Sequence, residues 1–121
     1  MKLDTSIIIS TYNSPQWLAK VLYGYNKQTY RNFEIIIADD GSTHETKDFI
    51  DKIRTELFYP LIHVWHEDNG FQKSEIHNKA IAKCHTDYII MSDGDCIPRI
   101  DFVAVHAKYR EKGYFLSGGY F

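Results

Sequence analysis

Two carboxylates separated by a single glycine, Asp93 and Asp95, are the residues of this sequence best suited to hold a metal ion. At positions i and i+2 they can face the same side of an extended or turning segment, and Gly94 lets the backbone approach a ligand closely. Mg²⁺ and Mn²⁺ favour such oxygen ligands and typically take one or two carboxylates together with substrate phosphates. The structural alternative is a polar turn whose aspartates bond only to local amides.

Two earlier clusters offer groups that can hold an organic ligand. Ser10-Thr11-Tyr12-Asn13 supplies hydroxyls and an aromatic ring that can stack on a base, although such a tyrosine can also pack on a sheet edge. Asp39-Asp40-Gly41-Ser42 supplies carboxylates, which accept hydrogen bonds from ribose in dinucleotide sites. Asp-Gly is also a turn signal, and Ser and Thr cap helices. We therefore assign Asp40 to ligand binding and Ser42 or Thr43 to capping.

The remaining polar candidates are individually weaker. Asn69-Gly70 is a turn first and a ligand contact second. Lys73, near the start of a predicted helix, can reach a diphosphate, although a lone lysine there is usually solvated. No histidine pairs convincingly with another ligand at metal spacing. His106 is predicted to lie in a core-facing seam, and for His77 both a structural and a ligand role stay open.

Short apolar runs alternate with amphipathic segments along the chain. The runs are typical of strands buried on both faces and lie at 6–10, 34–38, 61–65 and 88–91, with a fifth strand expected to begin at 114–116. Apolar residues at helical spacing predict helices that begin at Pro15, include 49–57, run from 73 to 84 and follow Pro98. This order predicts an α/β fold with a mostly parallel sheet and helices on both faces.

A parallel sheet gathers the polar clusters at one place. Right-handed crossovers put every strand-to-helix turn along one edge of the sheet, and ligands of such folds bind beyond the carboxyl ends of the strands. All the clusters described above follow predicted strands. Their shared rim favours a binding site over a set of unrelated turns.

Composition excludes several classes of protein. A chain of 121 residues with 44% hydrophobic and 15% aromatic residues predicts one folded domain over residues 1–121. A formal charge of −2 without a basic cluster argues against a nucleic-acid binder. The apolar runs are too short to span a bilayer, and Asp4 lies where a secretory signal would need apolar residues. Cys84 and Cys96 have neither the spacing of a zinc site nor that of a disulfide framework. We therefore expect a cytoplasmic protein.

The order of the clusters, S-T-Y-N, D-D-G-S, N-G-F and D-G-D-C-I-P, resembles family-2 glycosyltransferases with the GT-A fold. Residues 7–13 resemble the family's first strand and nucleotide loop, 28–35 its approach to the second strand, and 39–42 its uridine-contacting turn. Residues 69–71 and 77–80 resemble the segment beneath the diphosphate, 93–95 the DxD metal motif, and 101–103 the helix after it. The resemblance covers essentially the whole chain.

This resemblance implies an enzyme that transfers a sugar, with inversion, from a UDP-sugar to a hydroxyl of a glycan or lipid-linked acceptor, as in polysaccharide biosynthesis. It implies that Ser10, Tyr12 and Asp40 hold the base and ribose. Asp95 would bind Mn²⁺ or Mg²⁺ at the diphosphate, and Asp93 would lie near the ribose and donor sugar. Relatives often have Arg where this chain has His77, which makes Lys73 the alternative diphosphate contact. The whole predicted nucleotide-sugar set is Ser10, Thr11, Tyr12, Asn13, Asp40, Gly70, Lys73 and Asp93, with Asp95 and Asp93 as metal ligands.

The resemblance also implies a longer catalytic domain. Residues 116–121 resemble a mid-domain strand, so we expect the chain to be the N-terminal, nucleotide-sugar-binding half, with the catalytic base beyond residue 121. We expect this half alone to lack sugar transfer and to form homo-oligomers through its uncovered sheet edge. The full-length protein is expected to be cytoplasmic or peripheral to the inner face of a membrane.

Other functions remain as alternatives. A non-catalytic nucleotide- or metal-binding α/β module would use the same rim. A phospho-acceptor signalling domain would carry an acid pair after the first strand, where this chain has Ser10–Asn13. A sugar-nucleotide pyrophosphorylase would carry a glycine-rich basic loop there. No Walker A loop, G-x-G-x-x-G or G-x-S-x-G motif occurs, which disfavours NTPases, Rossmann enzymes and α/β-hydrolases.

Overall fold

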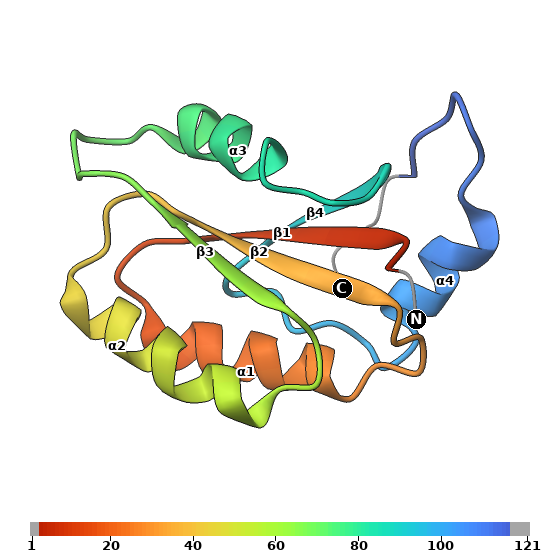
Figure 1. The fold of residues 1–121 in the computed structure, drawn as a ribbon, viewed down its shortest axis with the longest axis horizontal. Coiled ribbons are helices and arrows are strands. Elements are labelled where there is room, and N and C mark those ends of the chain that lie inside the picture. Colours follow the sequence, from red (N-terminus) through yellow and green to blue (C-terminus); the bar gives the residue numbers. More distant parts are fainter. Residues whose placement is uncertain (1–2, 117–121) are drawn as a thin grey trace.

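The structure, a computed structural model, describes residues 3–116 and shows strands alternating with helices (Figure 1). The strands are β1 (Thr5–Thr11), β2 (Phe33–Asp39), β3 (Leu61–Trp65) and β4 (Tyr88–Asp93). The helices are α1 (Pro15–Asn26), α2 (His44–Ile53), α3 (Lys73–Ile81) and α4 (Phe102–Tyr109), with a 3₁₀ turn η1 (Arg54–Glu56) after α2. None of the helices in this part of the chain combines the length and the apolar content of a membrane span.

The four strands pair in parallel in the order β3-β2-β1-β4. In the register, Ile7 of β1 lies between Ile35 of β2 and Ile90 of β4. Neighbouring parallel strands need long crossover connections, which the helices supply here. The carboxyl ends of all four strands therefore lie at the same edge, and the predicted parallel sheet is confirmed.

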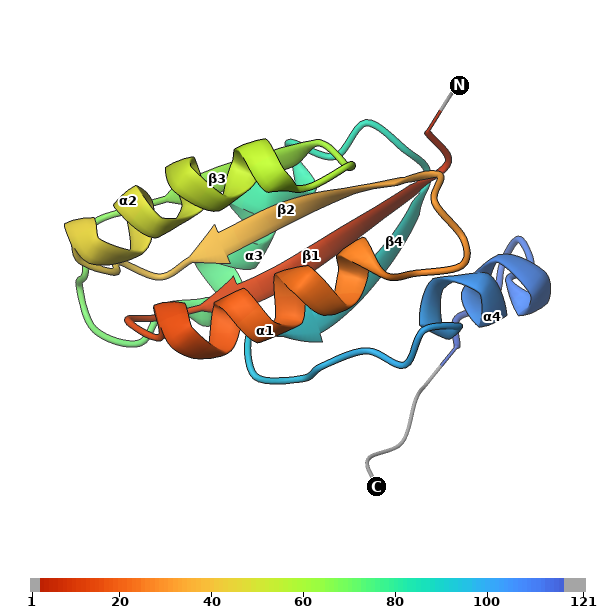
Figure 2. The ribbon, with the colours of Figure 1, turned by 90° about the horizontal axis from the view of Figure 1, so that it is seen from below.

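Helices cover both faces of the sheet, as the continuous apolar strands predicted. Successive side chains of a strand point to opposite faces, so Ile7 and Ile9 pack in one layer and Ile8 in the other. Figures 1 and 2 show α1 and α2 on the first face and α3 on the second. The first layer includes Leu18, Val21, Leu22, Ile50 and Ile53, and the second includes Ile36, Ala38, Ile76 and Ala80.

Three predicted elements differ in the structure. Tyr114–Leu116 does not begin a fifth strand, and Tyr114 and Phe115 are 72% and 89% exposed. An apolar run becomes a strand only where a neighbour completes its hydrogen bonds, and the described sheet ends at β4. The helix predicted to reach Cys84 ends at Ile81. The helix predicted to include 49–57 ends at Ile53 and is followed by η1, so Leu57 lies outside both. The rest of the predicted mid-domain strand, 117–121, lies outside the described residues.

The buried side chain of Gln28 anchors the segment that follows β4. Its Nε2 donates to the carbonyl oxygen of Arg99 at 2.6 Å, and its Oε1 accepts from the amide of Val103 at 3.1 Å. The amide of Thr29 also donates to the carbonyl oxygen of Ile100 at 2.9 Å. The loop between β4 and α4, which carries Asp95, is therefore held at its α4 end.

Candidate functional site

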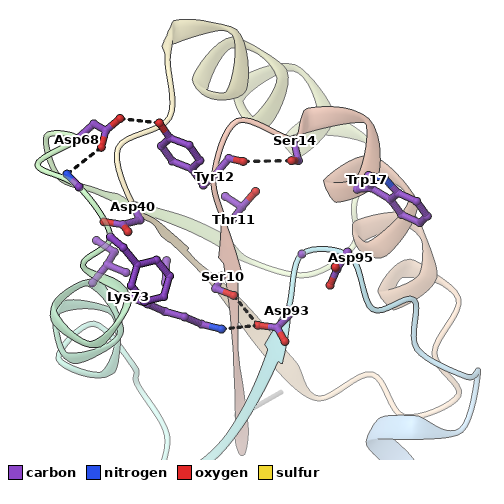
Figure 3. A pocket seen from close by; sticks show the side chains of 15 residues that line it. Ser10, Thr11, Tyr12, Ser14, Trp17, Asp40, Asp68, Lys73, Asp93 and Asp95 are labelled. Carbon is purple, nitrogen blue, oxygen red and sulfur yellow. Dashed lines mark hydrogen bonds and ion pairs between the residues drawn. The ribbon is translucent and has the colours of Figure 1, made fainter. Parts of the chain in front are cut away.

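A cavity of about 850 Å³ opens at the carboxyl ends of the strands (Figure 3). Tyr12, Asp40, Asp68 and Lys73 line one side of it, and Trp17 of α1 and Asp95 lie on the other. The predicted convergence is therefore observed: Ser10, Thr11, Tyr12, Asp40, Gly70, Lys73, Asp93 and Asp95 all line this cavity. Of the predicted binding residues, Asn13 alone is not part of the lining.

Asn13 instead joins the loop after β1 to the loop after β2. Its amide donates to Ser42 Oγ at 2.7 Å, and its Oδ1 accepts from the amide of Thr43 at 2.8 Å. Its φ of 48° lies in the left-handed region, where Asn is among the favoured residues. The predicted capping is wrong in detail. Thr43 occupies the N-cap of α2, but its side chain makes no capping hydrogen bond, and Ser42 Oγ accepts from the amide of Asn13 instead.

Two bonds fix the orientation of the Asp40 carboxylate. Oδ1 lies 2.5 Å from Nε2 of His66, and Oδ2 accepts from the amide of Gln72 at 2.9 Å. Burial alone would raise the pKa of Asp40, but the hydrogen bonds from His66 and Gln72 outweigh it and lower the pKa. Asp40 therefore presents an ionised, immobilised acceptor to the cavity. Sequence reasoning missed His66, because nothing in its local pattern links it to a residue 26 positions earlier.

The phenol of Tyr12 contacts the loop before α3. Its hydroxyl donates to Oδ2 of Asp68 at 2.6 Å, while Oδ1 of Asp68 accepts from the amide of Gly70 at 3.2 Å. The hydrogen bond to Asp68 raises the pKa of Tyr12. The ring is half exposed and lines the cavity, so one face of it is available to a planar ligand. Trp17, another exposed aromatic in the lining, was not predicted, since nothing in its local pattern set it apart.

Asp93 accepts two hydrogen bonds on the same oxygen. Oδ1 receives Ser10 Oγ at 2.8 Å and Lys73 Nζ at 2.9 Å. Both bonds lower the pKa of Asp93, and the bond from Lys73 has the larger effect, so the carboxylate is ionised. His77 lies near this pair, and burial together with the charge of Lys73 lowers its pKa. Within residues 3–116, the buried Nε2 of His77 finds no hydrogen-bond partner.

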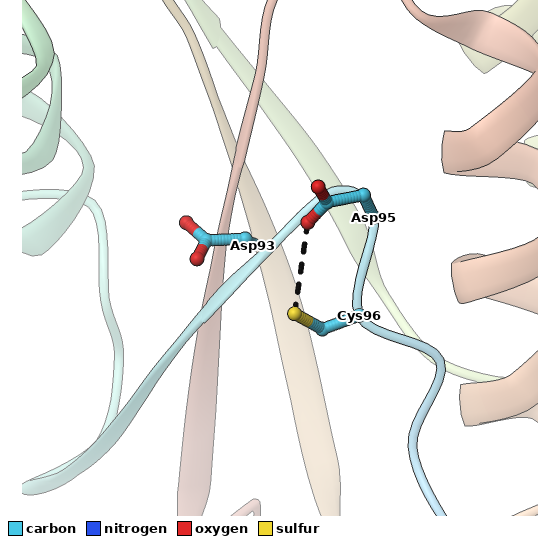
Figure 4. Close-up of side chains that lie close together, drawn as sticks. All are labelled: Asp93, Asp95 and Cys96. Atoms are coloured by element: carbon cyan, nitrogen blue, oxygen red, sulfur yellow. Dashed lines mark hydrogen bonds between the residues drawn. The ribbon is translucent and has the colours of Figure 1, made fainter. Parts of the chain in front are cut away.

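Asp93, Asp95 and Cys96 form a compact group of possible metal ligands (Figure 4). One ligand atom from each lies within 4.8 Å of the other two. Gly94 allows this turn, because its amide donates to the carbonyl oxygen of Ser10 at 2.7 Å and a Cβ would meet that oxygen at 2.6 Å. The thiol of Cys96 donates to Asp95 at 3.6 Å. Cys96 was not predicted as a ligand, although its adjacency to the acidic pair was a visible signal.

This donor set fits a hard divalent cation. Asp95 is exposed, and its carboxylate contacts only Cys96 among the side-chain hydrogen bonds of the described residues. Mn²⁺ and Mg²⁺ take one or two carboxylates and complete their coordination with water and phosphate. Burial and the hydrogen bond to Asp95 raise the pKa of the Cys96 thiol, which opposes the thiolate form. The carboxylates are therefore the better ligands.

A second, larger hollow of about 1140 Å³ runs along β4. It shares Lys73, Asp93 and Asp95 with the first cavity. Its other lining residues are mainly apolar and include Tyr88, Ile90, Met91, Ile97 and Phe102. The two carboxylates thus lie where the two hollows meet.

Comparisons with known proteins agree with this arrangement. The family model described as Glycosyl transferase family 2 matches residues 6–119. The glycosyltransferase GlyG of Streptococcus pneumoniae serotype 4 is 28% identical over 108 residues, which cover 88% of this chain and 35% of GlyG. Hyaluronan synthase of Pasteurella multocida is 34% identical over 94 residues, which cover 77% of this chain and 10% of the synthase.

Solved structures share the fold. Residues 1–349 of TarS from Staphylococcus aureus, in complex with UDP-GlcNAc, match with a TM-score of 0.72 and 23% identity over 88% of this chain and 30% of theirs. The mannosyltransferase PcManGT from Pyrobaculum calidifontis, in complex with GDP-Man and Mn²⁺, matches with a TM-score of 0.76 and 22% identity over 90% and 32%. The chain thus spans about a third or less of these relatives.

Proposed function

Because this chain belongs to glycosyl transferase family 2, we propose that its cavity binds the UDP-sugar donor of an inverting sugar transfer to an acceptor hydroxyl. The observation that carries the proposal is the meeting of Tyr12, Asp40, Lys73, Asp93 and Asp95 around one cavity at the carboxyl ends of parallel strands. TarS, a related β-N-acetylglucosaminyltransferase 27% identical to this chain over 92 residues, supports a UDP-sugar, since its structure contains UDP-GlcNAc.

Each part of the donor is assigned to the lining residues whose chemistry suits it. The base stacks on Tyr12 and bonds the Asp40 carboxylate, while Ser10, Thr11 and Gly70 lie within reach of the ribose and phosphates. Lys73 carries the positive charge closest to the acidic pair, and the diphosphate competes with Asp93 for it. His77, with a buried unpartnered nitrogen beside Lys73 and Asp93, is a second polar contact for this region. Asn13 shapes the loop that presents Tyr12 and does not touch the donor.

Asp95, with Asp93, would hold Mn²⁺ or Mg²⁺. When bound, the cation supplies positive charge that stabilises the leaving diphosphate. Ser10 and Lys73 keep Asp93 ionised and oriented for this task. The acceptor lies in the hollow along β4, where the two cavities meet, and its hydroxyl attacks the sugar from the face opposite the diphosphate. The glycan or lipid carrier would extend along the apolar lining.

A positioned base must take the proton of the acceptor hydroxyl as the new glycosidic bond forms. Among the described carboxylates of the cavity, Asp40, Asp68 and Asp93 are held by other groups, and Asp95 is assigned to the cation. We therefore place the base in a part of the polypeptide beyond residue 121. The homo-oligomer and the membrane-peripheral location expected from the sequence stay predictions.

Calorimetric titration tests this proposal with UDP, GDP and AMP, each with Mn²⁺ and with chelator. We expect UDP to bind most tightly and only with the cation. Asp40→Asn should weaken UDP binding. The matched variant Asp51→Asn, which removes the same charge from the exposed surface of α2, should not. Equal or metal-independent binding of the three nucleotides would remove the donor-site assignment.

A further inference from the structure

His66, which follows β3 directly, connects a lysine to the proposed base-binding carboxylate. Its Nε2 lies 2.5 Å from Oδ1 of Asp40, and its Nδ1 lies 3.0 Å from Nζ of Lys79 on α3. The side chains of His66 and Asp40 are only 10% and 12% exposed, so water competes little for these bonds. The chain of contacts therefore runs from α3 through His66 to the edge of the cavity.

The two partners define which ring nitrogen of His66 carries the proton. The ammonium group of Lys79 has donors only, so Nδ1 must accept. An ionised carboxylate has acceptors only, so Nε2 must donate to Asp40. Both contacts demand the same form of the ring, with the proton on Nε2.

A comparison with the preceding aspartate shows what is particular to Asp40. Asp39 is also paired with a histidine, since His63 Nε2 lies 2.7 Å from its Oδ2, and its Oδ1 accepts from the amide of Ser42 at 2.9 Å. The side chain of Asp39 is 1% exposed and lies outside the cavity lining. Asp40 has the same kind of support but lines the cavity, where it can accept a further hydrogen bond from a ligand.

We propose that His66 is a positioning residue that sets base selectivity by holding the Asp40 carboxylate as a fixed acceptor. The inference rests on the proposed function, in which Asp40 contacts the base. Uracil presents an N3–H donor, whereas cytosine presents a bare N3 acceptor at the same place. A carboxylate that cannot rotate away bonds the first and repels the second, and such unpaired or repulsive polar contacts discriminate strongly.

Substitutions at His66 separate the donor from the ring. In His66→Gln the side-chain amide can place an N–H near the position of Nε2, whereas His66→Asn is too short and His66→Leu has no donor. We expect Asn and Leu to weaken UDP binding about 10-fold, the scale of a lost charge-assisted hydrogen bond, and to reduce the preference for UDP over CDP. His66→Gln should retain most of both.

A matched control lies at the opposite end of the sheet. His85 also pairs with a carboxylate, since its Nδ1 lies 2.8 Å from Oε1 of Glu34. His85→Leu removes a histidine–carboxylate pair remote from the cavity and should leave UDP affinity and the UDP-to-CDP ratio unchanged. Nitrogen NMR of the wild-type chain gives a second readout, and we expect the Nε2 of His66 to be the protonated ring nitrogen.

The outcomes distinguish this inference from the donor site itself. If wild type binds UDP and Asp40→Asn does not, but His66→Leu keeps wild-type affinity and selectivity, the positioning role is wrong and the donor site stands. If wild type binds no UDP, the proposed function fails, and the role of His66 fails with it. If His66→Leu does not fold, the His66→Gln variant and the NMR of the wild-type chain decide. Loss of the preference for UDP over CDP in His66→Gln would overturn the inference, and so would a proton on Nδ1 of His66 in the wild type.

Discussion

Asp93 and Asp95 are chemically identical but differ in what surrounds them. Asp93 is ionised and held by Ser10 and Lys73, so one of its oxygens is already occupied. Asp95 is exposed, and its only described side-chain hydrogen bond comes from the weak thiol donor of Cys96. The more available carboxylate is therefore Asp95, which makes it the principal metal ligand in our proposal.

The first prediction compares the two aspartates. Asp95→Asn should weaken Mn²⁺-dependent UDP binding by at least about 10-fold. In metal sites, substitution of even a residue that only hydrogen-bonds to a ligand lowers metal affinity by this much. Asp93→Asn should cost less. Both variants should fold, because neither side chain packs in the core. Calorimetry with varied Mn²⁺ measures the effect. Normal metal-dependent binding by Asp95→Asn would mean that residues 93–95 form a polar turn without a metal-binding role.

At the scale of elements, three loops at the strand ends hold one another. Asn13 joins the loops after β1 and β2, and Tyr12 joins the first of these to Asp68 after β3. Gly41 lies so close to the third loop that a Cβ would meet the backbone of Asp68 at 2.5 Å. The cavity wall is therefore a set of mutually braced loops.

The second prediction isolates this close approach. Gly41 and Gly70 both have positive φ, 91° and 85°, so alanine strains the backbone at either place by about 1–2 kcal/mol. A Cβ at Gly70 meets nothing within 4 Å, whereas at Gly41 it meets backbone. Gly41→Ala should therefore lose more free energy of unfolding in urea than Gly70→Ala, and should weaken UDP binding. Equal losses would mean that the loops are not braced through Gly41.

The third prediction concerns the attachment of α4. Gln28→Leu keeps the side-chain volume but leaves the Val103 amide without its acceptor. It also removes one of two donors to the Arg99 carbonyl, which still accepts from the amide of Phe102. Each buried unsatisfied group costs about 1–3 kcal/mol, so we expect a clear loss of unfolding free energy. Hydrogen exchange of the Val103 amide should accelerate. The matched variant Gln72→Leu, whose side chain donates no described hydrogen bond, should leave that amide protected; equal protection in both variants would contradict the role of Gln28.

At the scale of the whole molecule, ionised carboxylates support both ends of the sheet. Asp40 and Asp93 lie at the cavity edge, and Glu34 lies near the opposite end, where it bonds Ser6 and His85. Burial alone would raise the pKa of Glu34, but the hydrogen bonds from the His85 amide, Ser6 and the His85 ring outweigh it. The pKa values of Glu34, Asp40 and Asp93 are all lowered in the folded state.

The fourth prediction follows from the sign of these shifts. A group whose pKa is lower in the folded state stabilises the fold above its unfolded pKa, and this contribution is lost as pH falls through the folded value. The carboxylates should therefore make the free energy of unfolding decrease steeply below about pH 4, while the lowered pKa of His77 adds a separate loss that begins below about pH 6.5. Glu34→Gln should be less stable at pH 7 and lose less on acidification. Urea unfolding from pH 7 to pH 3 measures both, and an unchanged acid slope in Glu34→Gln would contradict the assignment.

Local pattern in the sequence determined the elements and their common edge. Strand runs such as 6–10 and helical spacing from Pro15 depend on side chains a few positions apart, which a short window contains. Parallel crossovers then required the polar turns to share one rim, so Tyr12, Asp40 and Asp95 could be predicted to converge without knowing any distance.

The tertiary structure decided which groups pair. His66 with Asp40 and Lys73 with Asp93 join residues 26 and 20 positions apart, and no local pattern encodes these contacts. Ser42 and Thr43 have the right chemistry for caps, but Ser42 Oγ accepts from the amide of Asn13 and the Thr43 side chain makes no capping hydrogen bond. The apolar run at 114–116 has strand composition but no described neighbour to pair with. Segments that are distant in the sequence compete for the same hydrogen-bonding groups once the fold brings them together. Only the tertiary structure therefore shows which groups form hydrogen bonds with one another.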